Sequence, residues 1–242
     1  MQSIFTANRT ALVTGASAGI GLEITRALAP KLDSVIIVAR RVERLEQVAR
    51  ELQSRFSALN IAIEAADLSI SDGVESLLQR LEARRVNIDV LVNNAGVGES
   101  ELFDNSPWSR IHQIVEVNIV AMLRLSHHFL PAMIRRGHGA ILNIGSGAGY
   151  AAMPNAAVYT ASKHYVRAFT ESLRAQLTGT GITVSEAAPA PVESEFDDVA
   201  GIEGGATPGQ SMFRITAQEC ATDIVREFET GSPVIFLGTI IG

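Results

Sequence analysis

Short apolar runs alternate with longer amphipathic segments along nearly the whole chain. Each short run is bounded by Gly, Asn, Asp or Ser, which is typical of buried strands. Seven strands are predicted in this way, at residues 11–13, 35–38, 61–63, 88–92, 140–144, 182–184 and 234–237. Strands that are apolar on both faces and alternate with helices imply a parallel sheet that helices cover on both sides. We therefore expect an α/β protein with a Rossmann-type, doubly wound, seven-stranded parallel sheet.

The clearest helix is predicted over residues 42–56, where Leu45, Val48, Ala49, Leu52 and Phe56 recur at helical spacing with Arg and Glu between them. No internal repeat, low-complexity tract or linker divides the chain, so residues 1–242 are expected to form a single domain. One stretch has no period. It contains three prolines and four glycines between residues 189 and 214, and we expect residues 189–216 to form a lid over the substrate.

Charge is distributed unevenly. The formal net charge is −6, yet residues 1–174 hold 18 Lys and Arg against 16 Asp and Glu. Residues 175–213 hold six acids and no Lys or Arg. Because phosphate contacts need clustered basic residues, the chain is not expected to bind nucleic acid. Five of these acids lie between residues 193 and 203, so the lid is expected to disfavour strongly anionic substrates.

Other residue types exclude further classes. The single cysteine, Cys220, cannot form an intramolecular disulfide and is consistent with a reducing compartment. The five histidines show no metal-ligand spacing, so no metal site is expected. Residues 137–162 lack charges over a length that could cross a bilayer, but their five glycines and many polar groups favour a place inside a water-soluble fold. No secretory segment is evident, so we expect a cytoplasmic protein without a membrane partner.

The first strand leads into a glycine-rich turn, with glycines at 15, 19 and 21, and then into a helix. Such glycines permit a tight turn and a close approach of the backbone to a ligand, and the helix N-terminus offers N–H groups to a pyrophosphate. Strand, turn and helix in this order predict dinucleotide binding. The second strand ends in Ala39, Arg40 and Arg41. Arginine here suits the 2′-phosphate of NADP, whereas NAD enzymes usually place an acid there. The cofactor is thus expected to be NADP(H).

Tyr159 and Lys163 lie four residues apart in a helical pattern that continues to Leu177. This spacing puts the phenol and the ammonium on one helix face, where the cation favours the ionised phenol and makes it a usable proton donor or acceptor. Ser146 follows the fifth strand, and residues 93–96 follow the fourth. Because ligands in such sheets bind beyond the carboxyl ends of the strands, these segments are expected to converge on one site.

Together these segments resemble the short-chain dehydrogenase/reductase family over almost the full chain. The matching motifs are Thr-Gly-x-x-x-Gly-x-Gly at 14–21, Asn-Asn-Ala-Gly at 93–96 and Tyr-x-x-x-Lys at 159–163. Ser146 lies thirteen positions before Tyr159, as the family's catalytic serine does, and the family's helix asparagine matches Asn118.

The resemblance implies a role for each matching residue. Tyr159 would be the general acid or base, and Lys163 would bind the nicotinamide ribose and favour the ionised phenol. Ser146 would hydrogen-bond the substrate oxygen, and Asn118 would help to hold a water that relays protons. The implied cofactor contacts are Gly15, Ser17, Gly19, Ile20, Gly21, Arg40, Arg41, Asp67, Leu68, Asn93, Gly96, Tyr159, Lys163, Val192 and Ser194.

Three departures from the family pattern qualify the match. Residues 189–194 read Pro-Ala-Pro-Val-Glu-Ser where the family commonly has Pro-Gly-x-Val-x-Thr, so a Cβ stands where the family has glycine. Ala18 replaces the basic residue that many members carry in the glycine loop, which leaves NADP preference to Arg40 and Arg41. The Asp-Gly-Gly ending of many tetrameric members is also missing.

The expected activity is hydride transfer between NADP(H) and a secondary alcohol or ketone, catalysed by a homodimer or homotetramer that pairs helices at 107–136 and 156–177. Two alternatives stay open. One is a reductase of 3-oxoacyl groups on a carrier protein, although an acidic lid would oppose docking of acidic carriers. The other is an NADP-binding regulatory protein without turnover, although Tyr159, Lys163 and Ser146 are all present.

Overall fold

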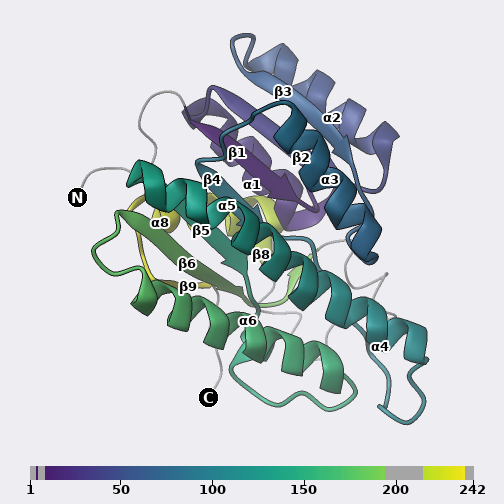
Figure 1. Cartoon of the computed structure of the whole chain (residues 1–242). Coiled ribbons are helices and arrows are strands. Elements are labelled where there is room, and N and C mark those ends of the chain that lie inside the picture. The colour runs from purple at the N-terminus through teal and green to yellow at the C-terminus, as the bar shows by residue number, and fades with distance from the viewer. Residues whose placement is uncertain (1–3, 5–8, 194–214, 238–242) are drawn as a thin grey trace.

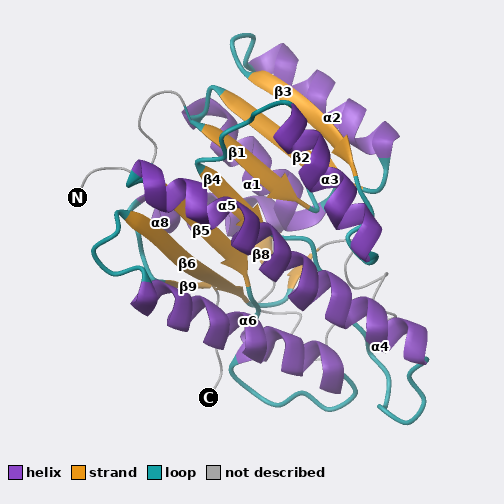
Figure 2. Cartoon of the chain, viewed as in Figure 1, coloured by secondary structure: helices purple, strands orange, loops and turns teal. Residues whose placement is uncertain are grey.

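The structure, a computed structural model, describes Ile4, residues 9–193 and residues 215–237. Seven parallel strands form one sheet in the order β3-β2-β1-β4-β5-β6-β9 (Figure 2). The strands are β1 (Thr10–Thr14), β2 (Ser34–Ala39), β3 (Asn60–Ala65), β4 (Val90–Asn93), β5 (Gly139–Ile144), β6 (Ile182–Pro189) and β9 (Val234–Leu237). All seven predicted strands and the Rossmann-type sheet are confirmed. Strand order reverses beside β1, which creates the crevice at which such sheets bind nucleotides.

Helices cover both faces of the sheet, and the apolar residues form a separate core on each (Figure 1). One face carries α1 (Gly19–Leu28), α2 (Val42–Arg55) and α8 (Ala217–Glu229). The other carries α3 (Ser71–Ala83), α5 (Met122–Arg136) and α6 (Ala157–Gln176). The short elements are η1 (Ala29–Lys31), α4 (Trp108–Val115), η2 (Glu116–Ala121) and η3 (Gly147–Gly149). The predicted helix at 42–56 is confirmed, with Leu45, Val48 and Leu52 buried.

The two edge strands, β3 and β9, differ from the prediction that every strand is buried, and in β9 the side chain of Phe236 is exposed. In β3, residues 61–63 are only partly buried and Glu64 is the buried member. The reason is that β3 is an edge strand, which pairs only with β2 in the sheet. An edge strand has one neighbour fewer to cover it. Glu64 is accommodated because Arg80 and Arg84 approach its carboxylate to 2.7 and 2.8 Å.

A second, two-stranded sheet was not predicted. β7 (Val192–Glu193) pairs in parallel with β8 (Ile215–Thr216), with Val192 opposite Ile215. Thr216 then caps α8: its Oγ1 accepts from the Glu219 N–H at 3.1 Å, while the Glu219 carboxylate accepts from the Thr216 N–H at 3.1 Å. The two ends of the predicted lid are thereby held together next to the main sheet. Residues 194–214 of that lid lie outside the described residues.

The segment from Trp108 to Arg136 is one continuous helical run that changes type in the middle. Between α4 and α5, η2 is a turn of π-helix, which lengthens the helix by a local bulge. Within the described residues this run is also the one segment long and apolar enough to cross a membrane by length and composition. Its buried residues, among them Leu125, Phe129 and Met133, pack into the protein core. Core helices commonly pass this test, so it is weak support for a membrane span.

Candidate active site

The glycine turn between β1 and α1 is built around the side chain of Asn94. Asn94 Nδ2 donates to the Thr14 carbonyl at 2.9 Å. A Cβ at Gly15 would lie 2.7 Å from that nitrogen, and one at Gly21 would lie 2.2 Å from it. Gly15 also has a φ of +67°, which L side chains rarely adopt. Glycine is therefore required at both positions, because the turn can pack on the end of β4 only without side chains there.

The beginning of α1 fits an anionic ligand. Within the described residues, no side chain caps this helix at Ala18, and its first turn holds no acid. The first N–H groups of a helix lack partners inside the helix and carry the positive end of its dipole. Ser17 and Ile20 flank this N-terminus and are partly exposed. The turn thus has the free N–H donors and the glycine backbone that a pyrophosphate requires.

Basic side chains gather beyond the end of β2. Arg40 and Arg41 are exposed, and Arg41 Nη2 lies 3.5 Å from Ser17 Oγ in the glycine turn. The charge of Arg40 reaches Asp67, and it reaches Arg110 on α4 as well. Burial raises the pKa of Asp67, but the hydrogen bonds from Ser69 and the charge of Arg40 outweigh it, so the pKa is lowered overall. The charge of Arg40 thus links the end of β2 with Asp67 and with Arg110, while Arg41 reaches the glycine turn.

Tyr159 and Lys163 both lie on α6, and the Lys163 ammonium is 5.7 Å from the centre of the Tyr159 ring. Lys163 is buried, and its Nζ donates to the Ile144 carbonyl at the end of β5, at 2.8 Å. Burial lowers the pKa of Lys163 to about 8, against the charge of Glu186, which raises it. An ammonium has three N–H donors. Since one of them is used among the residues that the structure describes, two remain for a ligand such as ribose hydroxyls.

Asn118 lies in the π-helical turn η2, which directs its side chain toward the end of β4. Its Oδ1 accepts from the Val97 N–H, and its Nδ2 donates to the Val97 carbonyl, each at 2.9 Å. The second Nδ2 hydrogen goes to Ser162 Oγ on α6, at 3.0 Å. A Cβ at Gly96 would lie 3.5 Å from Asn118 Oδ1 and 3.7 Å from Lys163 Nζ. Asn118 thus ties three elements together beside Lys163, and both of its amide hydrogens already have protein partners.

Ser146 follows β5 and begins the short helix η3. Its Oγ accepts from the Ala148 N–H at 3.1 Å, so the hydroxyl still has its own hydrogen to donate. Gly149, in the same turn, packs on the backbone of α6: a Cβ there would lie 2.9 Å from the Lys163 carbonyl. The serine turn and the helix that carries Tyr159 and Lys163 are therefore in direct contact.

Three of the predicted cofactor residues have buried side chains. Asn93 is buried, and its Nδ2 donates to Asn143 Oδ1 at 2.8 Å and to Ser126 Oγ at 3.1 Å. Leu68 and Val192 are also buried in the two cores. Any contact that Asn93 makes with a cofactor would come from its backbone, because its side chain is buried and its Nδ2 is bound between β5 and α5. Ser194 lies outside the described residues.

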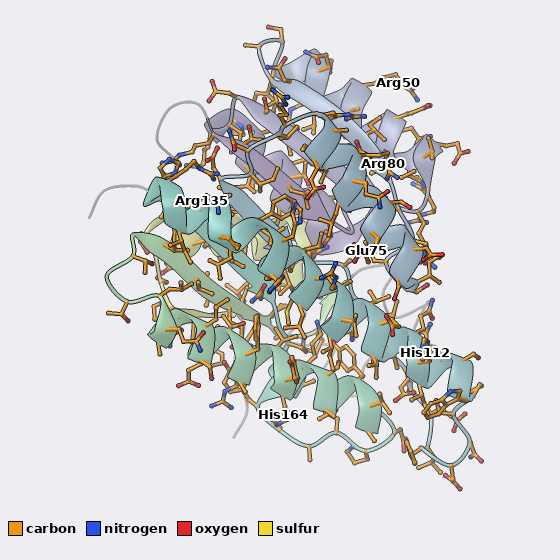
Figure 3. All side chains as sticks on the ribbon, in the orientation of Figure 1. Arg50, Glu75, Arg80, His112, Arg135 and His164 are labelled. Atoms are coloured by element: carbon orange, nitrogen blue, oxygen red, sulfur yellow. The ribbon has the colours of Figure 1, made fainter. Side chains whose placement is uncertain are left out.

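Other reactive groups do not gather into a second site. Figure 3 shows His112 on α4 and His164 on α6, on separate stretches of the surface. Within the described ranges, no group of three or more His, Cys, Asp or Glu side chains could hold a metal ion. Burial raises the pKa of Cys220 to about 12, with Asp223 adding to the shift, so the thiol stays protonated.

Sequence reasoning missed several residues that shape the site. Arg110 and Ser162 have no motif of their own and reach the site only through the packing of α4 and α6. Buried Glu186 accepts a hydrogen bond from the partly buried Tyr150 beneath the serine turn. A signal for Glu186 was present, because it is the one acid within the apolar sixth strand.

The chain is similar to known dehydrogenases and reductases. The family model of the short chain dehydrogenases matches residues 9–201. Sulfoacetaldehyde reductase of Chromohalobacter salexigens is 34% identical over 220 residues, which cover 89% of this chain and 84% of the relative. The NADP-dependent 3-hydroxy acid dehydrogenase of Escherichia coli is 36% identical over 190 residues, covering 78% of this chain and 75% of the relative.

A solved structure is similar over nearly the whole fold. The short-chain dehydrogenase of Sphingobium yanoikuyae in complex with NADPH superposes with a TM-score of 0.87 at 28% identity, covering 94% of this chain and 87% of the relative. The chain belongs to the short chain dehydrogenase family. These relatives are named as dehydrogenases and reductases, in agreement with the family, the enzyme class and the NADP(H) cofactor predicted from the sequence.

Proposed function

We propose that this chain is an NADP(H)-dependent oxidoreductase that transfers a hydride between the nicotinamide and the carbon of a secondary alcohol or ketone, with Tyr159 as general acid or base. The observation that carries the proposal is the position of Lys163. Its ammonium is buried, held by the Ile144 carbonyl and directed along the face of α6 that carries Tyr159. A buried ammonium next to a phenol has little purpose in a merely structural helix, because its desolvation is costly.

The cofactor fits the residues present. The glycine turn and the N-terminus of α1 would receive the pyrophosphate, and Arg40 and Arg41 would face the 2′-phosphate. When bound, NADP(H) supplies or accepts the hydride. Gly96 borders the space beside Lys163, where the two remaining N–H donors of the ammonium would bind the nicotinamide ribose.

The protein's own part is to orient the substrate and move the proton. In the reducing direction the Ser146 hydroxyl would donate a hydrogen bond to the carbonyl oxygen, and Tyr159 would give that oxygen its proton as the alcohol forms. The Lys163 cation stabilises the phenolate left behind. Asn118 would act as a positioning residue, because its side chain fixes Val97 and Ser162 beside the place where a water of the proton relay would bind.

The assignment is tested by the oxidation of NADPH over a panel of aliphatic, aromatic, steroidal and acyl ketones. Turnover of any of them supports the proposed reaction and begins to define the substrate. Tight NADPH binding, measured by fluorescence titration, without oxidation of any ketone would contradict the reaction and favour a regulatory role instead.

Arg40→Asp is expected to reverse the preference between the two nicotinamide cofactors. A carboxylate at this place repels a 2′-phosphate and can accept the 2′-hydroxyl of NADH. The ratio of kcat/KM for NADPH to that for NADH should fall by about tenfold or more. The matched control is Arg50→Asp, because Arg50 is an exposed arginine on the outer face of α2 (Figure 3) and the charge change is the same. Equal ratios before and after the Arg40 change would contradict the role of Arg40.

The homodimer or homotetramer expected from the family gains support from two helices. The run 108–136 and α6 lie side by side on one face of the molecule (Figure 1). The run exposes two large apolar side chains, Trp108 at 74% and Ile134 at 42%. Apolar surface of this kind is typical of interfaces between copies. Sedimentation velocity would measure the assembly, and a monomer at micromolar concentration would contradict it. A cytoplasmic location and a small-molecule carbonyl substrate complete the proposal.

A further inference from the structure

Glu186 is a buried acid that the proposed chemistry does not use. It lies in β6, only 2% exposed, with Asn143 of β5 as its partner in the register. Glutamate is rarely buried to this extent without a compensating interaction, since its charged form loses hydration. The neighbouring strand β5 is the one that ends in the serine turn, residues 145–150. Glu186 therefore lies beside the strand end that carries Ser146.

The two carboxylate oxygens of Glu186 reach opposite ends of this serine turn. Oε2 accepts a hydrogen bond from the Tyr150 hydroxyl at 2.8 Å. Oε1 lies beneath Gly145, where an added Cβ would approach it to 2.3 Å. Gly145 also donates its N–H to the Ala187 carbonyl, next to Glu186 in β6, at 2.7 Å. One side chain thus contacts the residue before Ser146 and the residue that ends the turn.

Tyr150 is itself held from two further sides. The Arg167 guanidinium of α6 lies 4.0 Å above the centre of its ring. The ring of Phe236 in β9 packs edge-on, with 4.7 Å between the two ring centres. Burial, together with the hydrogen bond to Glu186, raises the pKa of Tyr150, so the phenol remains a protonated donor. Between its two ends the turn is closed by the Gly149 N–H, which donates to the Ser146 carbonyl at 2.9 Å.

The charge around Glu186 is mixed. Burial raises the pKa of Glu186, while the Tyr150 hydrogen bond and the charges of Arg167 and Lys163 lower it and Glu171 raises it further. Within the described residues, Oε1 is buried and has no hydrogen-bond donor. A buried oxygen without a donor is costly. The Oε1 atom of Glu186 lies directly under Gly145 and occupies the space that a side chain at position 145 would need.

We infer that Glu186 is a positioning residue for Ser146: with Tyr150 it fixes the turn at 145–150, and so sets the direction in which the Ser146 hydroxyl meets the substrate oxygen. The inference rests on the proposed function for the part that concerns turnover. The contact with substrate belongs to Ser146, and Glu186 acts only through the turn.

The test compares four variants in the full-length protein: Tyr150→Phe, Glu186→Ala, Glu186→Gln and, as control, Tyr165→Phe. The control removes a phenolic oxygen from an exposed tyrosine on α6, which stacks on Phe169 away from the turn. Tyr150→Phe and Glu186→Ala are expected to lower kcat by about tenfold, because each removes the hydrogen bond between Tyr150 and Glu186, with NADPH affinity changed less than about twofold. Glu186→Gln should recover most of kcat, because its amide oxygen can still accept from Tyr150 and its shape still fills the space under Gly145.

Hydrogen–deuterium exchange of the peptide that spans residues 145–150 provides a second measurement that does not need turnover. Tyr150→Phe and Glu186→Ala should speed exchange in this peptide by about tenfold, while exchange in the preceding strand β5 stays unchanged. Wild-type kcat in Tyr150→Phe, or no recovery in Glu186→Gln, would overturn the positioning role. If wild-type protein turns over no ketone, the proposed function fails, and the exchange of this peptide still decides whether Glu186 holds the turn.

Discussion

Replacement of Tyr159 by phenylalanine is expected to lower kcat by about a thousandfold while leaving the Kd for NADPH within about twofold of the wild-type value. The change removes one hydroxyl and keeps the ring, so the packing of α6 and the site of Lys163 are retained. Without the phenol, the substrate oxygen has no positioned proton donor and must take its proton from water. Steady-state NADPH oxidation gives kcat, and fluorescence titration gives the Kd.

Tyr165→Phe is the matched control, because Tyr165 lies on the same helix and is 40% exposed. It should retain wild-type kcat. If Tyr159→Phe also retained most of its activity, the acid–base role of Tyr159 would be wrong. A large rise in the Kd for NADPH instead would make Tyr159 a cofactor ligand more than a proton donor.

Lys163→Met is expected to lower kcat by about a hundredfold or more, because the neutral side chain can neither bind the ribose nor stabilise a phenolate.

The activity of the wild-type protein should depend on the positive charge of Lys163. Burial lowers the pKa of Lys163 to about 8, so the ammonium loses its proton as the pH rises through that value. We therefore expect kcat/KM for ketone reduction to decline above about pH 8. A pH profile of kcat/KM that stays flat to pH 10 would contradict the role of the Lys163 charge.

The same pKa shift predicts that stability rises with pH over the range in which activity is expected to fall. The folded-state pKa of Lys163 is about 8 against an ordinary value of 10.5, so between these values the unfolded chain binds the proton and the native chain does not. Stability must then rise with pH across this window. Below pH 8 both states carry the proton, and the buried ammonium costs the fold on the order of 3 kcal/mol.

Urea unfolding of the cofactor-free protein measures this cost. The free energy of unfolding of Lys163→Met, minus that of wild type, should be about 2 to 3 kcal/mol larger at pH 7 than at pH 10. The comparison between the two pH values is needed because methionine also leaves the Ile144 carbonyl without its donor, which costs roughly 1 to 3 kcal/mol at every pH. A stability difference independent of pH would mean that Lys163 is not held as a buried cation.

Most of the fold was predictable because parallel strands covered on both faces are continuous apolar runs, and a period of 3.6 residues marks the helices between them. The exceptions have local causes. β3 was read as buried since its residues 61–63 are apolar, although as an edge strand it is only partly covered. The pairing of β7 with β8 involves two residues in each strand and leaves no periodic pattern. The π-helical turn η2 adds its bulge without interrupting the apolar pattern.

The candidate site was predictable to the extent that its residues occur in ordered motifs. The spacing of Tyr159 and Lys163 and the ends of β1, β4 and β5 follow directly from the chain. Contacts across the fold do not. Asn118 bonds to Val97, 21 residues away, and Tyr150 bonds to Glu186, 36 residues away. Such pairs depend on strand register and helix packing, which local patterns do not specify.

The short pairing of β7 with β8 has a consequence for how substrate range can change. Because Val192 lies opposite Ile215, the chain leaves at 193 and returns at 215 at neighbouring positions, whatever residues connect them. The capped start of α8 and the end of β6 then keep their places independently of that connection. The entropy of closing such a connection grows only slowly with its length. We therefore expect that new sequences and lengths between residues 195 and 214 can be tried by directed evolution while the sheet and the tyrosine helix stay the same.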